Sequence, residues 1–173
     1  SLFIVPIPYE EACRLFDLLD SRGIYFEVFT NQGLYSENQE ERIQLFAEHI
    51  AEIMPHLTHK MAIAMTAAHL EQLPIIHTEN NRQTLLDEEL EVLKIICFHN
   101  EGPAILGPVA AEIDRYGDLV VTSSGTNNLE INHKNAQKGI AVAHIAKDRG
   151  IDLADVMTIG DNLNDLSMIQ LAG

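Results

Sequence analysis

The sequence predicts an α/β protein in which a mixed module of strands and helices is followed by the α, β, α tail of a doubly wound parallel sheet. Over roughly the first 133 residues, short runs rich in β-branched and aromatic residues alternate with segments of helical spacing. From Gln137 the pattern changes to a helix, an unbroken apolar run and another helix. An unbroken run is typical of a parallel strand that is covered on both faces. The 173 residues are 46% hydrophobic and 21% charged, which favours a folded domain over a disordered chain.

The first part of the module is expected to contain a strand, a helix and a strand pair. Residues 2–5 are apolar and are followed by two prolines, which indicates a short strand. Residues 10–21 have apolar side chains at helical spacing. Residues 24–29 and 34–36 are separated by Asn31-Gln32-Gly33, a turn sequence, and therefore predict two paired strands.

The rest of the module is a helical block followed by strands. Prolines at positions 55 and 74 end two apolar stripes of the block. The expected elements are, in order, helices over 43–54, 61–73 and near 84–90, a strand over 92–99, a helix over 103–116, and a hairpin that pairs 119–123 with 128–132.

The tail has three expected elements. A helix covers 137–149 and ends at Gly150, a glycine C-cap. The run 156–159 predicts a buried parallel strand, and Leu163 begins the final helix.

The charge balance restricts the partners. Asp and Glu number 26 against 11 Lys and Arg, which gives a net charge of -15, and no cluster of basic residues is present. We therefore expect no nucleic-acid partner and no membrane partner, because both need a cationic surface. An anionic substrate would need a metal ion or one well-placed Lys or Arg.

Cysteine use and the lack of targeting signals indicate a cytoplasmic protein. Cys13 and Cys97 have no paired spacing, so neither a disulfide framework nor a zinc site is expected. No apolar run approaches the roughly 18 residues of a membrane span, and the N-terminus does not resemble a signal peptide. The chain starts at Ser1 and stops just after a helical pattern, so we expect it to be part of a longer protein.

The turn Gly160-Asp161-Asn162-Leu163-Asn164-Asp165 carries the clearest chemical signal. It follows the predicted strand at the sheet edge where ligands collect in α/β proteins. Asp161 and Asp165 are four residues apart and can converge, and two converging carboxylates with amide support suit Mg2+. Helix capping by Asp161 or Asn162 is the simpler alternative and stays open at this point.

Lys138 is the second chemical signal, because it begins the helix whose return strand leads to Asp161. About a dozen helical residues descend roughly 18 Å, and a strand of about five residues climbs back by a similar distance. Lys138 and Asp161 should therefore lie at the same edge of the sheet. A cation at a helix N-terminus is unfavourable unless an anion is bound nearby, so this pair predicts an anion site.

Three strings resemble one known family: Asn128-Leu129-Glu130-Ile131, Gln137-Lys138-Gly139, and the segment from Gly160 to Met168. They are similar to those of the haloacid dehalogenase-like (HAD) phosphatases, in particular the Cof-type branch, subfamily IIB, with the larger α/β cap of type C2B. The resemblance implies that residues 1–133 are the α/β cap domain. It also implies that residues 134–173 are the C-terminal portion of the Rossmann-like, doubly wound HAD core.

The resemblance also implies roles for individual residues. Lys138 corresponds to the catalytic lysine that neutralises the substrate phosphate and steadies the nucleophile. Asp161 corresponds to a Mg2+ ligand, and Asp165 supports the metal site from behind this ligand without binding the ion directly. Asn164 faces the phosphate or its nucleophile.

The departure from the family concerns the nucleophile. Family members carry an Asp-x-Asp motif whose first carboxylate attacks phosphorus, and this chain has no Asp-x-Asp. We expect that motif upstream of Ser1. The complete protein is then a Mg2+-dependent phosphatase of small phosphorylated metabolites such as sugar phosphates, acting through an aspartyl-phosphate, while the chain alone is inactive. A phosphosugar mutase of the same superfamily and a non-catalytic binding or oligomerisation module remain alternatives, and no oligomeric state is indicated.

Overall fold

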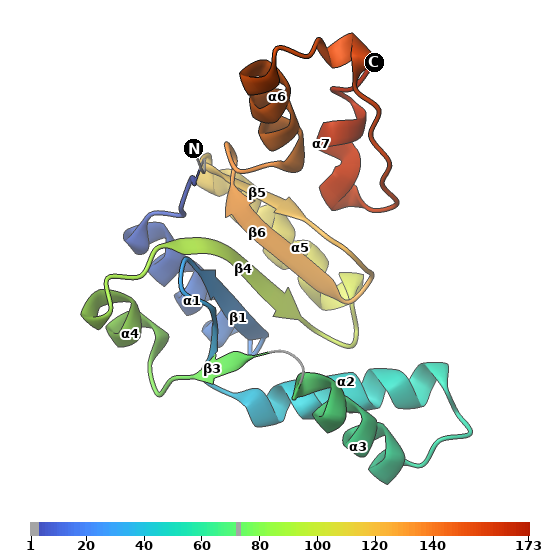
Figure 1. Ribbon diagram of the computed structural model, residues 1–173. Helices are drawn as coiled ribbons and strands as arrows, with labels where there is room; N and C mark the ends of the chain where they lie inside the picture. The colour runs from blue at the N-terminus through green and yellow to red at the C-terminus, as the bar shows by residue number, and fades with distance from the viewer. Residues whose placement is uncertain (1–3, 72–73) are drawn as a thin grey trace.

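A single mixed sheet organises the protein in the computed structural model, which describes residues 4–71 and 74–173 (Figure 1). Among these residues the sheet has six strands in the order β3-β2-β1-β4-β6-β5. The strands are β1 (Tyr25–Thr30), β2 (Leu34–Ser36), β3 (Ile75–His77), β4 (Val92–Phe98), β5 (Leu119–Thr122) and β6 (Asn128–His133). The α-helices are α1 (Tyr9–Ser21), α2 (Gln39–Ile53), α3 (His59–Leu70), α4 (Asn81–Asp87), α5 (Pro103–Ile113), α6 (Lys138–Arg149) and α7 (Leu166–Ile169). Short 3-10 helices are η1 (Asp114–Tyr116), η2 (Leu153–Asp155) and η3 (Leu163–Asp165).

The strand pairing is antiparallel except between β2 and β3. Antiparallel neighbours can be joined by tight turns, and β1 and β2 are joined in this way through residues 31–33. The parallel pair β2 and β3 needs a long crossover, and the helical hairpin α2–α3 supplies it. In Figure 1 this hairpin extends away from the sheet, at the end opposite to α6 and α7.

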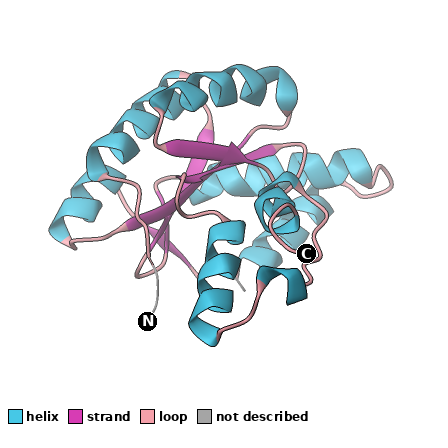
Figure 2. Cartoon of the chain, turned by 90° about the horizontal axis from the view of Figure 1, so that it is seen from above, coloured by secondary structure: helices cyan, strands magenta, loops and turns pink. Residues whose placement is uncertain are grey.

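The core lies between one face of the sheet and helices α1 and α5. Side chains alternate along each strand, so every second residue of β4 and β6 points to this core. The central members are fully buried: Leu15, Leu19, Val28, Ile95, Cys97, Val109, Ile113 and Ile131 are all 0% exposed. Figure 2 shows helices on both sides of the sheet. The intervening residues of the strands, among them Glu27, Lys94 and Glu130, occupy the other face, which we call the open face.

Helix α2 is fixed to the open face by a buried polar cluster. Arg42 of α2 forms an ion pair with Glu27 of β1, and both residues are buried. The Tyr25 hydroxyl donates to Glu27 Oε1 at 2.8 Å and lies 2.9 Å from Ser36 Oγ. The Arg42 guanidinium also lies over the Phe46 ring, 4.8 Å from its centroid. Charge pairing and aromatic contact together hold the base of the α2–α3 hairpin.

The structure confirms the α/β class and most of the expected elements, with shifted ends. The predicted helix near 84–90 starts earlier, at Asn81, because the Asn80 side chain accepts a hydrogen bond from the backbone N–H of Gln83 and caps it. The predicted helix over 61–73 starts at His59, and its last predicted residues, 72 and 73, lie outside the described residues. The expected strand over 2–5 falls partly on undescribed residues. Its described part is not a strand, and only Ile7 forms an isolated bridge, with Val92.

The predicted buried strand over 156–159 is wrong for this structure. The segment pairs with no strand among the described residues, and Met157 and Ile159 are both 82% exposed. A parallel strand is stable only when neighbouring strands satisfy its backbone and cover its faces, and no such neighbour lies beside this segment in the described part of the chain. The order helix, extended segment, helix is still present through α6 and α7. The boundary between residues 133 and 134 stays a prediction.

No helix in the described ranges 4–71 and 74–173 combines the length and the hydropathy that a membrane crossing requires.

Candidate functional site

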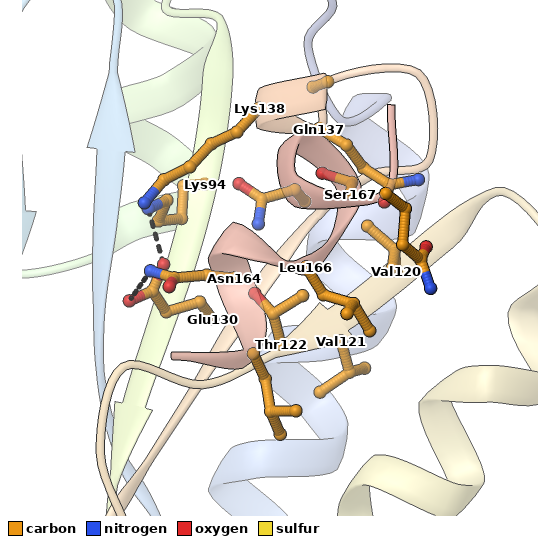
Figure 3. Close-up of a pocket in the computed structure, with 14 residues that line it drawn as sticks. Lys94, Val120, Val121, Thr122, Glu130, Gln137, Lys138, Asn164, Leu166 and Ser167 are labelled. Carbon is orange, nitrogen blue, oxygen red and sulfur yellow. Dashed lines mark hydrogen bonds and ion pairs between the residues drawn. The ribbon is translucent and has the colours of Figure 1, made fainter. Parts of the chain in front are cut away.

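A pocket of about 350 Å³ lies between the open face of the sheet and the C-terminal segment (Figure 3). One wall comes from β4, β5 and β6, and the other comes from the start of α6, from η3 and from α7. Polar and apolar side chains both line it: Lys94, Val120, Val121, Thr122, Glu130, Asn132, Ala136, Gln137, Lys138, Leu163, Asn164, Leu166, Ser167 and Gln170. The volume is in the range of small-molecule sites.

The start of α6 is held against α7 by a close backbone approach at Gly139. The backbone N–H of Gly139 donates to Ser167 Oγ at 3.0 Å. A Cβ at position 139 would lie 2.3 Å from the Ser167 carbonyl oxygen, so only glycine fits without movement. This contact fixes Lys138, the neighbouring residue, beside the turn that precedes α7.

The acidic turn is organised around the buried carboxylate of Asp165. Its Oδ2 accepts from the backbone N–H groups of Asp161 at 3.3 Å and Asn162 at 3.4 Å, and its Oδ1 accepts from Lys138 Nζ at 2.5 Å. The hydrogen bond from Lys138, aided by the two backbone N–H groups, lowers the pKa of Asp165 although burial opposes this. Asp165 packs so closely on Gly160 that a Cβ there would lie 2.3 Å from the Asp165 Cβ. The carboxylate is therefore charged at neutral pH and holds the turn and Lys138 together.

The structure brings Lys138 to the acidic turn, but its direct partner is Asp165 rather than Asp161. Lys138 is half exposed at the pocket rim, with 49% of its side chain accessible. Asp161 is exposed, and its Oδ1 accepts from Asn162 Nδ2 at 3.2 Å. Of the two residues in the capping alternative, Asn162 is the N-cap of η3, where it forms a capping box with Asp165. The turn thus caps a helix and presents the Asp161 carboxylate to solvent.

Asp161 is the residue of the acidic turn whose carboxylate is available to bind a metal ion. Among the residues that the structure describes, no group of three or more His, Cys, Asp or Glu side chains could surround an ion. Both oxygens of Asp165 already accept hydrogen bonds, which suits a supporting position better than direct ligation. The exposed carboxylate of Asp161 fits as one ligand of a hard cation such as Mg2+, and the described residues do not complete the set.

Asn164 connects the turn to the sheet. Its Nδ2 donates to Glu130 Oε1 at 3.4 Å, and its backbone N–H donates to the Ser123 carbonyl at 3.4 Å. Its side chain points across the pocket toward Glu130 in Figure 3. Asn164 therefore lies in the pocket wall, between the acidic turn and the open face.

The sequence reasoning missed the charged pair on the open face. Lys94 Nζ donates to Glu130 Oε2 at 2.8 Å, and both residues line the pocket. Burial alone would raise the pKa of Glu130, but hydrogen bonds from Lys94 and Ser124, with the charge of Lys94, outweigh it and lower this pKa. The available signal was the single charged residue, Lys94, within the otherwise apolar strand β4, whereas Glu130 lies in the more polar strand β6.

Comparisons with known proteins find the same hydrolase family by sequence model and by individual relatives. The model of the haloacid dehalogenase-like hydrolase family matches residues 2–173. The 5-amino-6-(5-phospho-D-ribitylamino)uracil phosphatase YwtE of Bacillus subtilis is 30% identical over 161 residues, which cover 91% of this chain and 54% of that protein. The phosphatase YwpJ of the same organism is 27% identical over 173 residues, with 96% of this chain and 59% of the relative covered.

A solved structure from the same family has a similar fold. A haloacid dehalogenase-like hydrolase from B. subtilis superposes with a TM-score of 0.80 at 25% identity, over 97% of this chain and 59% of that chain. The chain thus spans somewhat more than half the length of the proteins it matches.

Proposed function

Because the chain belongs to the haloacid dehalogenase-like hydrolase family, we propose that the whole protein is a Mg2+-dependent phosphatase of small phosphorylated metabolites. In this proposal residues 1–133 form the cap and residues 134–173 the C-terminal portion of the core. The observation that carries it is the ion pair of Lys138 and Asp165 at the rim of the pocket.

Lys138 is the residue that meets the phosphate. Its ammonium group is half exposed at the rim, and Asp165 fixes its position by a hydrogen bond of 2.5 Å. Asp165 is itself held by two backbone N–H groups, so it stays in place when Lys138 turns to a phosphate oxygen. Phosphoryl transfer is accelerated mainly by fixed positive groups of this kind, which stabilise charge on the transferring group.

Asp161 is the residue that would hold Mg2+, with Asp165 behind it. A bound Mg2+ ion would offset negative charge on the phosphate oxygens. The nucleophile is an aspartate outside this chain, since the chain has no Asp-x-Asp, and it would form the aspartyl-phosphate that water then hydrolyses.

The pocket and the relatives both support the proposed substrate class. The pocket is small and has both charged and amide side chains, which suits a polar metabolite rather than a macromolecule. The B. subtilis relative YwtE is named for a substrate with a phosphorylated ribityl group, which supports a phosphorylated sugar or polyol here.

The test is hydrolysis of p-nitrophenyl phosphate by the full-length protein that contains this chain, with and without Mg2+. Lys138→Met is expected to lower kcat/KM by about 100-fold or more, because a fixed cation at the transferring group is lost. Lys147→Met, on the exposed end of the same helix, is the matched control and should leave activity unchanged. Equal activities of the two variants would contradict the proposal.

The alternatives appear as other outcomes of the same test. A phosphosugar mutase would return the phosphate on a new position of the sugar instead of as inorganic phosphate. A binding or oligomerisation module would be folded and give no turnover at all.

A further inference from the structure

Lys94 and Glu130 are the two charged residues in the wall of the pocket that the sheet supplies, and the proposed phosphatase activity does not use them. They come from the neighbouring strands β4 and β6, and their side chains lie on the open face. In the register of this pair, Glu130 is opposite Ile96, so Lys94 is its diagonal neighbour on the same face. Both side chains therefore project from paired, hydrogen-bonded strands of the sheet.

We propose that Lys94 and Glu130 are specificity-determining residues that favour a phosphate ester with uncharged hydroxyl groups on its leaving group over one with a second anionic group. The inference rests on the proposed function, because it assigns the leaving-group end of the same pocket.

The ion pair of Lys94 and Glu130 has no net charge, and it offers a ligand both hydrogen-bond donors and an acceptor. Lys94 Nζ uses one of its three N–H groups for Glu130 Oε2 at 2.8 Å. The Lys94 side chain is 33% exposed and the Glu130 side chain 7% exposed, so a ligand in the pocket reaches Lys94 first. The remaining N–H groups of Lys94 can donate to a hydroxyl oxygen. The amide of Asn132, which also lines the pocket, adds a donor and an acceptor.

The charge of Glu130 works against a second anion at this wall. Lys94 is compensated by Glu130, whose other oxygen is held by Asn164 Nδ2 at 3.4 Å. A carboxylate or second phosphate placed beside Lys94 would also lie beside Glu130, and it would have to separate the ion pair or accept the repulsion. A hydroxyl group carries no such cost. The Lys138 end of the pocket differs, because Lys138 is joined through Asp165 to the acidic turn, whose Asp161 could hold a cation.

The pair is also connected to the acidic turn through Asn164. Asn164 is the residue before Asp165, and it contacts Glu130 by its side chain and Ser123 by its backbone. The distance between the phosphate end and the leaving-group end of the pocket is therefore set by hydrogen bonds within one connected network. This favours a short leaving group that contacts both ends at once.

The experiment compares two substrates of the same length in the full-length protein. Glycerol 3-phosphate and 3-phosphoglycerate differ at the far end of the leaving group, where one has a hydroxymethyl group and the other a carboxylate. The ratio of their kcat/KM values is measured for the wild type, Glu130→Gln and Lys94→Met, with Glu91→Gln as a control on an exposed carboxylate outside the pocket.

The two variants should move the ratio in opposite directions. The wild type is expected to favour glycerol 3-phosphate by about tenfold, and Glu130→Gln, which frees the Lys94 charge, should raise the relative use of 3-phosphoglycerate by about tenfold. Lys94→Met leaves Glu130 uncompensated and should lower that relative use below the wild-type value. A purely structural ion pair would change both substrates equally, so unchanged ratios, or shifts in the same direction, would overturn the inference.

The failure of this inference is distinguishable from the failure of the proposed function. Turnover with unchanged ratios overturns the inference alone. If no ester is hydrolysed, the proposed function fails, and the same ratio is then measured from the equilibrium dissociation constants of the two compounds. Binding with the predicted opposite shifts supports the inference, and binding of neither compound overturns it. Thermal unfolding followed by circular dichroism checks that each variant is folded.

Discussion

Breaking the buried ion pair between Arg42 and Glu27 should destabilise the protein more than any exposed ion pair would. Arg42→Met removes the guanidinium and keeps an apolar side chain against Phe46, so the main loss is electrostatic. Glu27 is 1% exposed, and without Arg42 the hydrogen bond from Tyr25 is the one it keeps among the described residues. A stranded buried charge costs about 3–5 kcal/mol. Loss of the contact between the guanidinium and the ring adds about 1 kcal/mol.

The measurement is urea unfolding of the 173-residue chain, followed by far-UV circular dichroism. With an m value of about 2 kcal/mol/M, a loss of about 4 kcal/mol shifts the midpoint by about 2 M. Arg22→Met is the control, because Arg22 and Glu112 form an exposed pair at 2.9 Å, and such pairs contribute about 0–1 kcal/mol.

A double-mutant cycle shows whether the charge is the cause. Glu27→Gln should be nearly as destabilising as Arg42→Met, because it strands the other charge while the amide oxygen can still accept from Tyr25. The double variant holds no buried charge, so its loss should be smaller than the sum of the two single losses by about 3 kcal/mol. A coupling energy below about 1 kcal/mol would refute the electrostatic reasoning and leave packing as the explanation.

Three further predictions concern the site and the core. Gly139→Ala should destabilise the chain in the urea assay and weaken phosphate binding, since its Cβ would lie 2.3 Å from a carbonyl oxygen of the next helix. The control Gly107→Ala, inside α5, meets nothing within 4 Å and should not destabilise the chain, because alanine is favoured over glycine in a helix. Cys97 is fully buried, and burial raises the pKa of its thiol to about 12. Of the two cysteines, only Cys13 should therefore react with a disulfide reagent before urea is added, and reaction of both thiols in the folded protein would contradict this. The pKa of Glu130 is lowered in the folded state, so its carboxylate stabilises the fold above the unfolded pKa, and this contribution is lost as pH falls through the folded pKa. Glu130→Gln should therefore weaken the fall in the free energy of unfolding when the pH is lowered from 7 to 3.

The elements that could be predicted from sequence are those with local signals. The turn Asn31-Gln32-Gly33 gave the pairing of β1 and β2, and the alternation of helix and strand patterns gave α1, α5 and the hairpin of β5 and β6. Residues 156–159 were misassigned because an apolar run identifies a strand only if another strand lies beside it. That condition depends on the rest of the fold and is invisible in the run itself.

The part of the site formed by Lys138 and the acidic turn was predictable, because these residues are separated only by one α-helix and the segment that follows it. Because the length of the helix is similar to that of the segment that returns alongside it, Lys138 was expected near the acidic turn. The structure has it there, although its partner is Asp165. Lys94 and Glu130 were not predictable as a pair. Their contact depends on β4 and β6 being neighbours, with both residues on the open face, and nothing local in either strand indicates its neighbour.

The position of the α2–α3 hairpin has a consequence for how this protein can diversify. The hairpin enters through β2 and leaves through β3 at one margin of the sheet, whereas the cavity is built on β4, β5 and β6 toward the other margin. Insertions or deletions in the hairpin would alter the outline of the molecule without displacing the binding groups. The binding residues on β4, β5 and β6 can thus stay unchanged while the segment between β2 and β3 varies in length and shape.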